Sequence, residues 1–159
     1  MKILIIYYSR TGTTRKVAEL LATKLGAEIE ELKDTVDRSG AMGYLMAGKD
    51  ASLKKLTKLE PLKHNLAEFE LVIIGTPIWS WNLSVPVRTF LEEQKNKISK
   101  AAFFCTMGGS GDTRAKKDLE KIIGKGVITD LSLTTKEVVQ NQHEEKVAEF
   151  VDRLMSAIN

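Results

Sequence analysis

The segment Ile5–Thr14 constrains the fold more than any other part of the sequence. An apolar run ends at Tyr8, a turn rich in hydroxyl groups follows at Ser9–Thr14, and an apolar helical pattern begins after it. Gly12 permits a tight turn, and the first amides of a helix have no partner inside that helix. The order predicts a strand, an anion-binding loop and a helix start, which together can hold a phosphate group.

The helix after this loop is indicated by the spacing of Val17, Leu20, Leu21 and Leu25, and Gly26 is a typical residue at its end. One N-cap residue would suffice to start such a helix without any ligand. The loop offers four hydroxyl groups, so we favour a ligand-binding role over simple capping. These hydroxyls belong to Ser9, Thr11, Thr13 and Thr14.

Alternating strand and helix patterns continue along the chain. Continuous apolar runs at Ile3–Tyr7, Leu71–Ile74 and Ala101–Cys105 are typical of parallel strands covered on both faces. The more polar runs Ala27–Leu32 and Val127–Leu133 suit the edges of a sheet. The pattern predicts an α/β fold with a doubly wound, five-stranded parallel sheet in the order 2-1-3-4-5 and helices on both faces.

Ligands of such sheets bind at the carboxyl ends of the strands, where the strand order reverses. For the order 2-1-3-4-5 this point lies between the first and third strands. It selects three loops as candidate site segments: Ser9–Thr14, Thr76–Ser84 and Thr106–Asp112.

The first of these loops resembles a known motif. Ser9-Arg10-Thr11-Gly12-Thr13-Thr14 is similar to the T/S-x-T-G-x-T phosphate loop that follows the first strand of flavodoxins. The resemblance implies a single flavodoxin-like domain over residues 1–159 that binds FMN non-covalently through its 5′-phosphate. Arg10, at the variable position, either adds charge to this phosphate site or faces water, and we favour water.

Both tryptophans of the chain lie in the second loop. Such aromatic side chains beyond the end of a strand can cover a planar apolar ligand. Flavodoxins place an aromatic residue here to stack on the flavin, and Trp79 matches this position better than Trp81, which either packs beneath the loop or lines its rim. The candidate cofactor-binding residues are Thr76, Pro77, Ile78, Trp79, Ser80 and Trp81.

The third loop contains three glycines, so its backbone can approach a ligand closely and point amides at it. A strand-to-helix turn capped by Asp112 would need only one glycine. We therefore expect this loop at the pyrimidine edge of the flavin, with Thr106, Met107, Gly108, Gly109 and Asp112 as candidate residues. The second stacking aromatic that flavodoxins commonly carry here is absent, so Met107, a partner or solvent covers that face.

Two further features depart from the flavodoxin pattern. Ser80 stands where many flavodoxins have a glycine whose peptide flips to bond the reduced flavin, and a non-glycine residue flips at a steric cost. Flavodoxins that carry electrons are typically acidic, whereas this chain has a net charge of +3. The absent second aromatic and Ser80 favour a reductase, because an open flavin face admits a substrate, whereas the small size and the complete phosphate loop favour an electron carrier.

The segment Asp37–Pro61 is longer than a simple connection and replaces the compact second helix that the fold leads us to expect. One interpretation is a helix with a loop packed on the sheet. The other is a flap near the flavin or a dimer contact that uses Met42, Tyr44 and Met46.

Composition narrows the possible partners and cellular locations of the protein. The basic residues are interspersed with acidic ones and no binding motif accompanies them, so we expect no nucleic-acid partner. No apolar run approaches the roughly 20 residues of a membrane span, and the N-terminal residues lack a signal-peptide pattern. Cys105 is the single cysteine, so no internal disulfide forms, and we expect a cytoplasmic protein. His64 and His143 lie on polar stretches and are expected at the surface.

The sequence therefore predicts an FMN-binding protein that passes electrons to a redox partner protein or a small acceptor. The alternative is an NAD(P)H-dependent flavin or quinone reductase of the same fold, and use of the fold for binding without flavin is the third possibility. We expect no metal site and assign no catalytic residue. Both a monomer and a homodimer fit the sequence.

Overall fold

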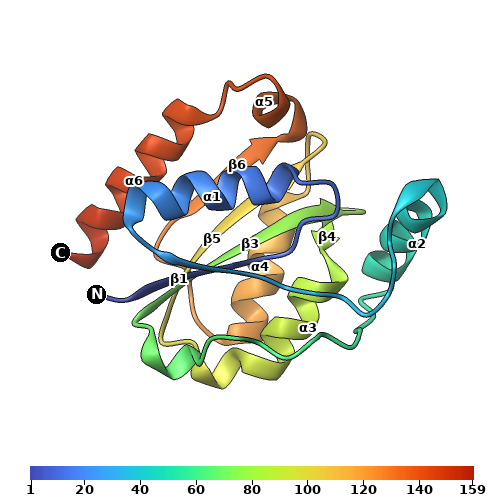
Figure 1. Cartoon of the computed structure of the whole chain (residues 1–159), viewed down its shortest axis with the longest axis horizontal. Coiled ribbons are helices and arrows are strands. Elements are labelled where there is room, and N and C mark those ends of the chain that lie inside the picture. Colours follow the sequence, from blue (N-terminus) through green and yellow to red (C-terminus); the bar gives the residue numbers. More distant parts are fainter.

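Strands and helices alternate to build a parallel sheet with helices on both faces in the computed structural model, which describes residues 1–159 (Figure 1). The strands are β1 (Ile3–Tyr7), β2 (Glu28–Glu31), β3 (Leu71–Trp79), β4 (Asn82–Leu83), β5 (Lys100–Met107) and β6 (Asp130–Thr134). The α-helices are α1 (Thr13–Leu25), α2 (Gly40–Ser52), α3 (Val85–Gln94), α4 (Asp112–Ile123), α5 (Thr135–Val139) and α6 (Glu144–Ile158). Short 3₁₀ turns lie at Leu66–Glu68 and Lys95–Lys97.

The parallel strands follow the order β2-β1-β3-β5-β6, and the short strand β4 pairs antiparallel with the end of β3. The predicted fold class is confirmed. The strand count differs by one because the sequence pattern did not reveal β4; the fourth and fifth predicted strands are β5 and β6. The two polar strands lie at the edges, as expected, with β2 beside β1 and β6 beside β5.

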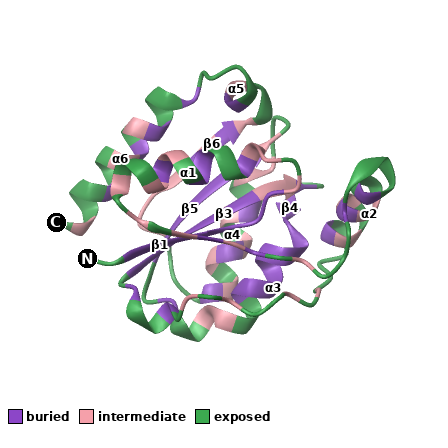
Figure 2. Ribbon diagram, in the orientation of Figure 1, coloured by how far each residue is buried: buried purple, intermediate pink, exposed green.

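Each face of the sheet has its own hydrophobic core, which explains the continuous apolar strands. On one face, Ile5 and Phe104 belong to a cluster with Val17 of α1 and Phe150 of α6. On the other face, residues of α3 and α4 such as Phe90 pack over the sheet. Figure 2 shows the strands buried between the helices. Full burial of each such large apolar side chain stabilises the fold by about 1.5–3 kcal/mol.

Helix α2 is the clearest difference from the expected chain path. It occupies residues inside the predicted long connection Asp37–Pro61 and lies beside the carboxyl end of the sheet, apart from the two main helical layers (Figure 1). Only Gly43, Ala47 and Ala51 are buried in this helix. The interpretation as a helix is therefore correct for residues 40–52.

The expectation that both histidines lie at the surface is wrong for His143. His143 is buried, with 3% of its surface exposed, because it precedes α6 where that helix begins to pack on the core. His64 is only half-buried, and its Nδ1 lies 2.7 Å from a carboxylate oxygen of Glu30. No helix is both long and apolar enough to cross a membrane.

Candidate cofactor site

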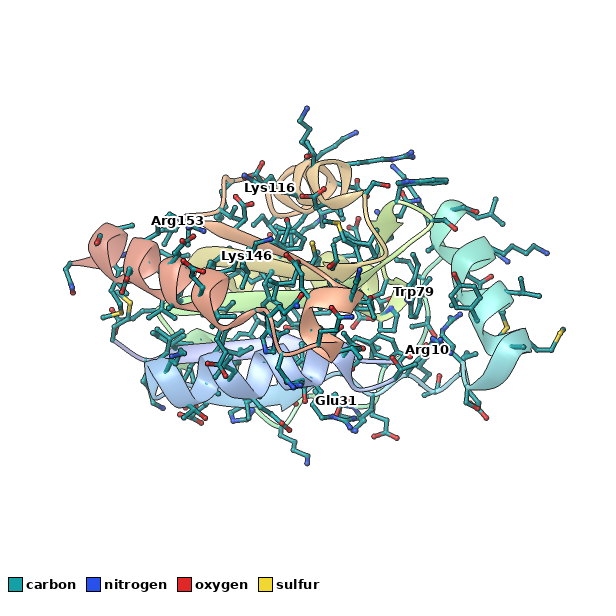
Figure 3. The ribbon with its side chains drawn as sticks, turned by 90° about the horizontal axis from the view of Figure 1, so that it is seen from above. Arg10, Glu31, Trp79, Lys116, Lys146 and Arg153 are labelled. Carbon is teal, nitrogen blue, oxygen red and sulfur yellow. The ribbon has the colours of Figure 1, made fainter.

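A cavity of about 270 Å³ lies at the carboxyl ends of β1, β3 and β5, where the three predicted loops meet. Figure 3 shows Arg10 and Trp79 at this end of the molecule, next to α2. The lining residues come from the three predicted segments and from two helices. They are Ser9, Arg10, Thr11, Thr13, Thr14, Tyr44, Pro77, Ile78, Trp79, Thr106, Met107, Gly108 and Thr135.

The first loop forms the N-terminal end of α1 as predicted. Gly12 has a left-handed backbone with φ of 95°, which turns the chain from β1 into the helix. The backbone amides of Thr11, Thr13 and Thr14 donate no hydrogen bond within the protein. Three free donors at a helix N-terminus make a site for an anion.

Ser9 has a structural role inside this loop. Its hydroxyl oxygen accepts hydrogen bonds from the amides of Gly12, at 3.0 Å, and Arg15, at 3.2 Å. Since a hydroxyl has two acceptor positions and one hydrogen, only the hydrogen of Ser9 is left for a ligand. The loop is thus held in shape before any ligand binds.

Thr14 links the first loop to the third. Its hydroxyl lies 2.8 Å from the hydroxyl of Thr106, and both residues are buried. Thr11 and Thr13, by contrast, make no side-chain hydrogen bond within the protein. The four hydroxyls therefore divide into two that shape the cavity and two that are free to bind a ligand.

Trp79, rather than Trp81, borders the cavity. Its ring meets the ring of Tyr8 edge-on at a centroid distance of 5.4 Å, and the guanidinium of Arg38 lies 5.7 Å from its centroid. Only 8% of Trp79 is exposed. These contacts fix the indole of Trp79 as a rigid wall of the cavity. Burial, and next the charge of Asp34, raises the pKa of Tyr8, so the phenol of Tyr8 is neutral.

The second loop is shorter than expected, because β3 continues to Trp79 and turns directly into β4. Ser80 and Trp81 form this turn, and both have positive φ, 48° and 60°. Trp81 points away from the cavity: it is 58% exposed, and its ring nitrogen donates a hydrogen bond to Ser110 at 2.9 Å. Of the two places considered for Trp81, the exposed ring fits the rim of the loop and not packing beneath it.

Several other predicted residues lie outside the cavity lining. Thr76 is fully buried, and its hydroxyl bonds Ser84, which closes the β3–β4 hairpin. Gly109 is exposed, with open space around it, and Asp112 lines a separate polar pocket at the start of α4. Of the glycines in the third loop, only Gly111 is required by the fold, because a side chain there would collide with Ile78 and Trp81.

Two lining residues come from outside the three loops. Tyr44 of α2 closes one side, and the guanidinium of Arg10 lies 5.3 Å from its ring centroid, so Arg10 folds over this ring instead of extending into water as we favoured. Thr135 of α5 donates a hydrogen bond to the carbonyl of Met107. The T-x-x-E pattern of Thr134 and Glu137 is a capping box, a sequence signal that could have revealed the start of α5 but was not used.

The lining of the cavity carries positive and no negative charge. Arg10 is its one ionised side chain, since neither Asp nor Glu contributes. Behind Trp79, Arg38 is paired with Asp34 at 2.7 Å and Asp50 at 3.0 Å. The arrangement therefore fits FMN: three free amides, two free hydroxyls and a cation suit its phosphate, and the wall formed by Trp79 suits a planar ring.

A sequence model of the family described as flavodoxin matches residues 2–154 of the chain. The fold is also similar to solved structures. A flavoprotein from Lactobacillus acidophilus NCFM, crystallised in complex with FMN, has 26% sequence identity and a TM-score of 0.71, with 87% of this chain and 97% of that chain covered. A flavoprotein from Bacteroides eggerthii has 25% identity and a TM-score of 0.72, with 87% and 94% covered.

A more distant similarity shows a likeness of fold alone. A flavodoxin from the domain Archaea aligns over 100% of both chains with 16% identity and a TM-score of 0.58. No curated protein sequence matches the chain.

Proposed function

Since the chain belongs to the flavodoxin family over residues 2–154, we propose that it binds one FMN non-covalently at the carboxyl end of the sheet and transfers electrons through it. The observation that carries the proposal is the N-terminus of α1, where three amides without an acceptor face a cavity that ends at Trp79. The FMN complex of the Lactobacillus flavoprotein, at 26% identity, supports the same cofactor.

In this proposal each part of the cavity has a defined task. The amides and free hydroxyls of Thr11 and Thr13 bind the phosphate, and Ser9 keeps their loop in shape. Trp79 packs against the ring, and the backbone near Gly108 approaches its edge. FMN supplies the redox chemistry, whereas the protein supplies binding, orientation and electrostatics.

The favoured role is that of an electron carrier between a redox partner protein, or a small acceptor, and its donor. A reductase that takes hydride from NAD(P)H is the second candidate, and the charge of the site favours it. Arg10 is the one charged residue in the cavity lining, so no carboxylate there opposes the negative charge that a flavin gains when it accepts hydride. The chain is also basic, whereas typical flavodoxin carriers are acidic.

Anaerobic reduction of the FMN-loaded protein distinguishes the two roles. A carrier shows the long-wavelength absorbance of one-electron-reduced flavin during stepwise reduction and no reaction with NADH or NADPH. A reductase is bleached directly by one of these nucleotides. Failure to retain FMN would reject both roles.

A further inference from the structure

Helix α2 reverses the usual distribution of side chains on a surface helix. Its buried face consists of the small residues Gly43, Ala47 and Ala51. Surface helices normally bury their large apolar residues and expose polar ones. In α2 the large apolar residues lie on the solvent side instead, where Met42 is 79% exposed and Leu45 is 64% exposed. Figure 2 shows this helix beside the sheet, with much of its surface exposed.

The exposed apolar residues follow one side of the helix. Leu45 and Leu53 come three and eleven residues after Met42, which is close to one and three whole turns of an α-helix. All three side chains are exposed, and so is Leu56, just after the helix. We call Met42, Leu45 and Leu53 the outer stripe. Exposed apolar side chains that gather on one face indicate a surface for a partner or a membrane.

The same segment carries the positive charge of the protein. Residues 40–58 contain four lysines and one aspartate, a net charge of +3 that equals the net charge of the whole chain. The aspartate, Asp50, is already paired with Arg38. The rest of the chain is therefore neutral in sum, and the charge of the molecule is concentrated beside the outer stripe. The lysines are Lys49, Lys54, Lys55 and Lys58.

The composition of this surface favours one kind of partner. A second copy of the chain would bring two basic segments together, and their like charges would repel. Protein–protein interfaces are depleted in lysine and enriched in arginine, yet every cation of residues 40–58 is a lysine. At a membrane, by contrast, the lysine stem lies along apolar surface while its ammonium group reaches the headgroups. Exposed leucine and methionine beside lysine therefore fit a lipid surface with negative headgroups.

We propose that α2 docks the protein reversibly on an anionic lipid surface. The outer stripe enters the boundary between headgroups and acyl chains, and the four lysines bind the negative headgroups. A few apolar side chains and a few charges give a weak, reversible attachment, unlike that of a membrane-spanning helix. None of these residues lines the cofactor cavity, so the inference does not depend on FMN.

Flotation of the protein with lipid vesicles tests this proposal. We expect the protein to float with vesicles of phosphatidylcholine and phosphatidylglycerol in equal parts, and not with pure phosphatidylcholine, because the lysines need negative headgroups. Added salt should release the protein by screening these charges. The double variant Lys49→Gln with Lys58→Gln should weaken partitioning about 25-fold, at about fivefold for each lysine.

The matched control for these charges is Lys24→Gln with Lys121→Gln. Both lysines are exposed, and they lie on α1 and α4, away from the outer stripe. This control should partition nearly like the wild type, since charges farther than a Debye length from the lipid are largely screened.

The apolar contribution is tested separately. Met42→Ser with Leu45→Ser should lower partitioning at least about tenfold, because two apolar side chains no longer enter the lipid. The matched control is Val139→Ser with Met155→Ser, which removes two exposed apolar side chains from α5 and α6. Both double variants should unfold in urea like the wild type, since the replaced side chains are exposed.

Three results would overturn the proposal: no flotation, equal flotation with neutral vesicles, or flotation that the α2 variants do not weaken. Light scattering without lipid identifies the other possible occupants of the outer stripe. A dimer that Met42→Ser with Leu45→Ser dissociates would assign the stripe to a second copy and overturn the proposal. A monomer that fails to float would also overturn it and leave an acidic protein as the occupant.

Discussion

Individual hydroxyls in the phosphate loop have different roles, although the sequence presents them as equivalent. Ser9 accepts two backbone hydrogen bonds, whereas Thr11 is exposed and makes none. We expect Ser9→Ala to lower the free energy of unfolding of the cofactor-free protein by about 1 kcal/mol. Thr11→Ala should leave it within about 0.5 kcal/mol. Urea unfolding measures both values.

The same two variants should act differently on ligands. Thr11→Ala is expected to weaken FMN binding about five- to tenfold, the effect of one lost hydrogen bond to a charged group. Binding of riboflavin, which has no phosphate, should not change. Equal effects on FMN and riboflavin would show that Thr11 does not contact the phosphate.

Ser80 occupies a backbone conformation that glycine adopts more easily. Ser80 and Trp81 both have positive φ, as in the type I′ turns that join two strands and favour Asn-Gly. Such a conformation costs a residue with a side chain about 1–2 kcal/mol. Glycine avoids this cost, but its greater freedom in the unfolded chain offsets part of the resulting gain in stability.

Ser80→Gly is therefore expected to stabilise the protein by about 0.5 kcal/mol, measured by urea unfolding. Ser80→Ala is the control, because it removes the hydroxyl but keeps the strained φ. If alanine stabilised the protein as much as glycine, the hydroxyl and not the backbone would be responsible.

Residue roles were predictable where they depend on local sequence. The pattern from Ser9 to Thr14 reveals the turn, and the structure brings it to one cavity with Trp79 and Met107. Tyr44 was considered only as part of a possible flap near the flavin or a dimer contact, and its place at the cavity, like that of Thr135, depends on how α2 and α5 pack. Thr76 lies outside the cavity lining because β3 continues through it, and the sequence pattern did not indicate this continuation.

Among the elements, α2 was the hardest to predict. Its sequence contains three glycines besides exposed Met42 and Leu45, which weakens the helical pattern. One of these glycines is required by packing, because a Cβ at Gly43 would lie 2.2 Å from the backbone of Arg38. Helix α2 is held by burial of Ala47 and Ala51 and by ion pairs, which are tertiary contacts.

The ion pair of Arg38 and Asp50 links α2 to the chain that precedes it and should make stability depend on pH. Burial alone would raise the pKa of Asp50, but the hydrogen bond and charge of Arg38 outweigh it, so this pKa lies below its usual value. A lowered carboxylate pKa stabilises the folded state above the unfolded value near 3.9, and the contribution is lost as the pH falls below about 4.

We expect Asp50→Asn to be less stable than wild type by about 1 kcal/mol at pH 7, with the difference shrinking between pH 5 and pH 2.5. Asp152→Asn, an exposed carboxylate of α6 without an ion pair, is the control and should track the wild type. Denaturation at several pH values provides the comparison. A constant difference across this range would exclude the charge of Asp50 as the cause.

Helix α2 should also contribute to cofactor binding. Tyr44 borders the cavity, yet 62% of it is exposed, so its removal should hardly affect stability. We expect Tyr44→Ala to weaken FMN binding about three- to tenfold, since aromatic contacts contribute about 0.5–1.5 kcal/mol. Tyr44→Phe should bind like wild type. Met42→Ala, an exposed residue of the same helix outside the cavity, should have no effect.

At the scale of the whole molecule, the fold followed from hydrophobic patterning. Continuous apolar strands require helices on both faces, and the two polar strands can lie only at the edges. The missed strand β4 has two residues, Asn82 and Leu83, too few to give a periodic pattern. It forms because the type I′ turn reverses the chain at the end of β3.

Cys105 offers a probe of the stability of the whole molecule. It is fully buried in β5, and burial raises the pKa of its thiol to about 12. A thiol reagent should therefore react only after unfolding. At a free FMN concentration of 100 times Kd, labelling should slow about 100-fold, because ligand binding stabilises the native state by about 2.7 kcal/mol. Fast labelling unaffected by FMN would show local exposure of the thiol.

Titration of the cofactor-free protein with FMN and with riboflavin, followed by flavin fluorescence, tests the central claim most directly. The three free amides and two hydroxyls at the start of α1 predict quenching that saturates at one FMN per chain. The phosphate should make FMN bind at least about 100-fold more tightly than riboflavin. Equal affinities would contradict the phosphate site, and no saturable quenching would contradict cofactor binding altogether.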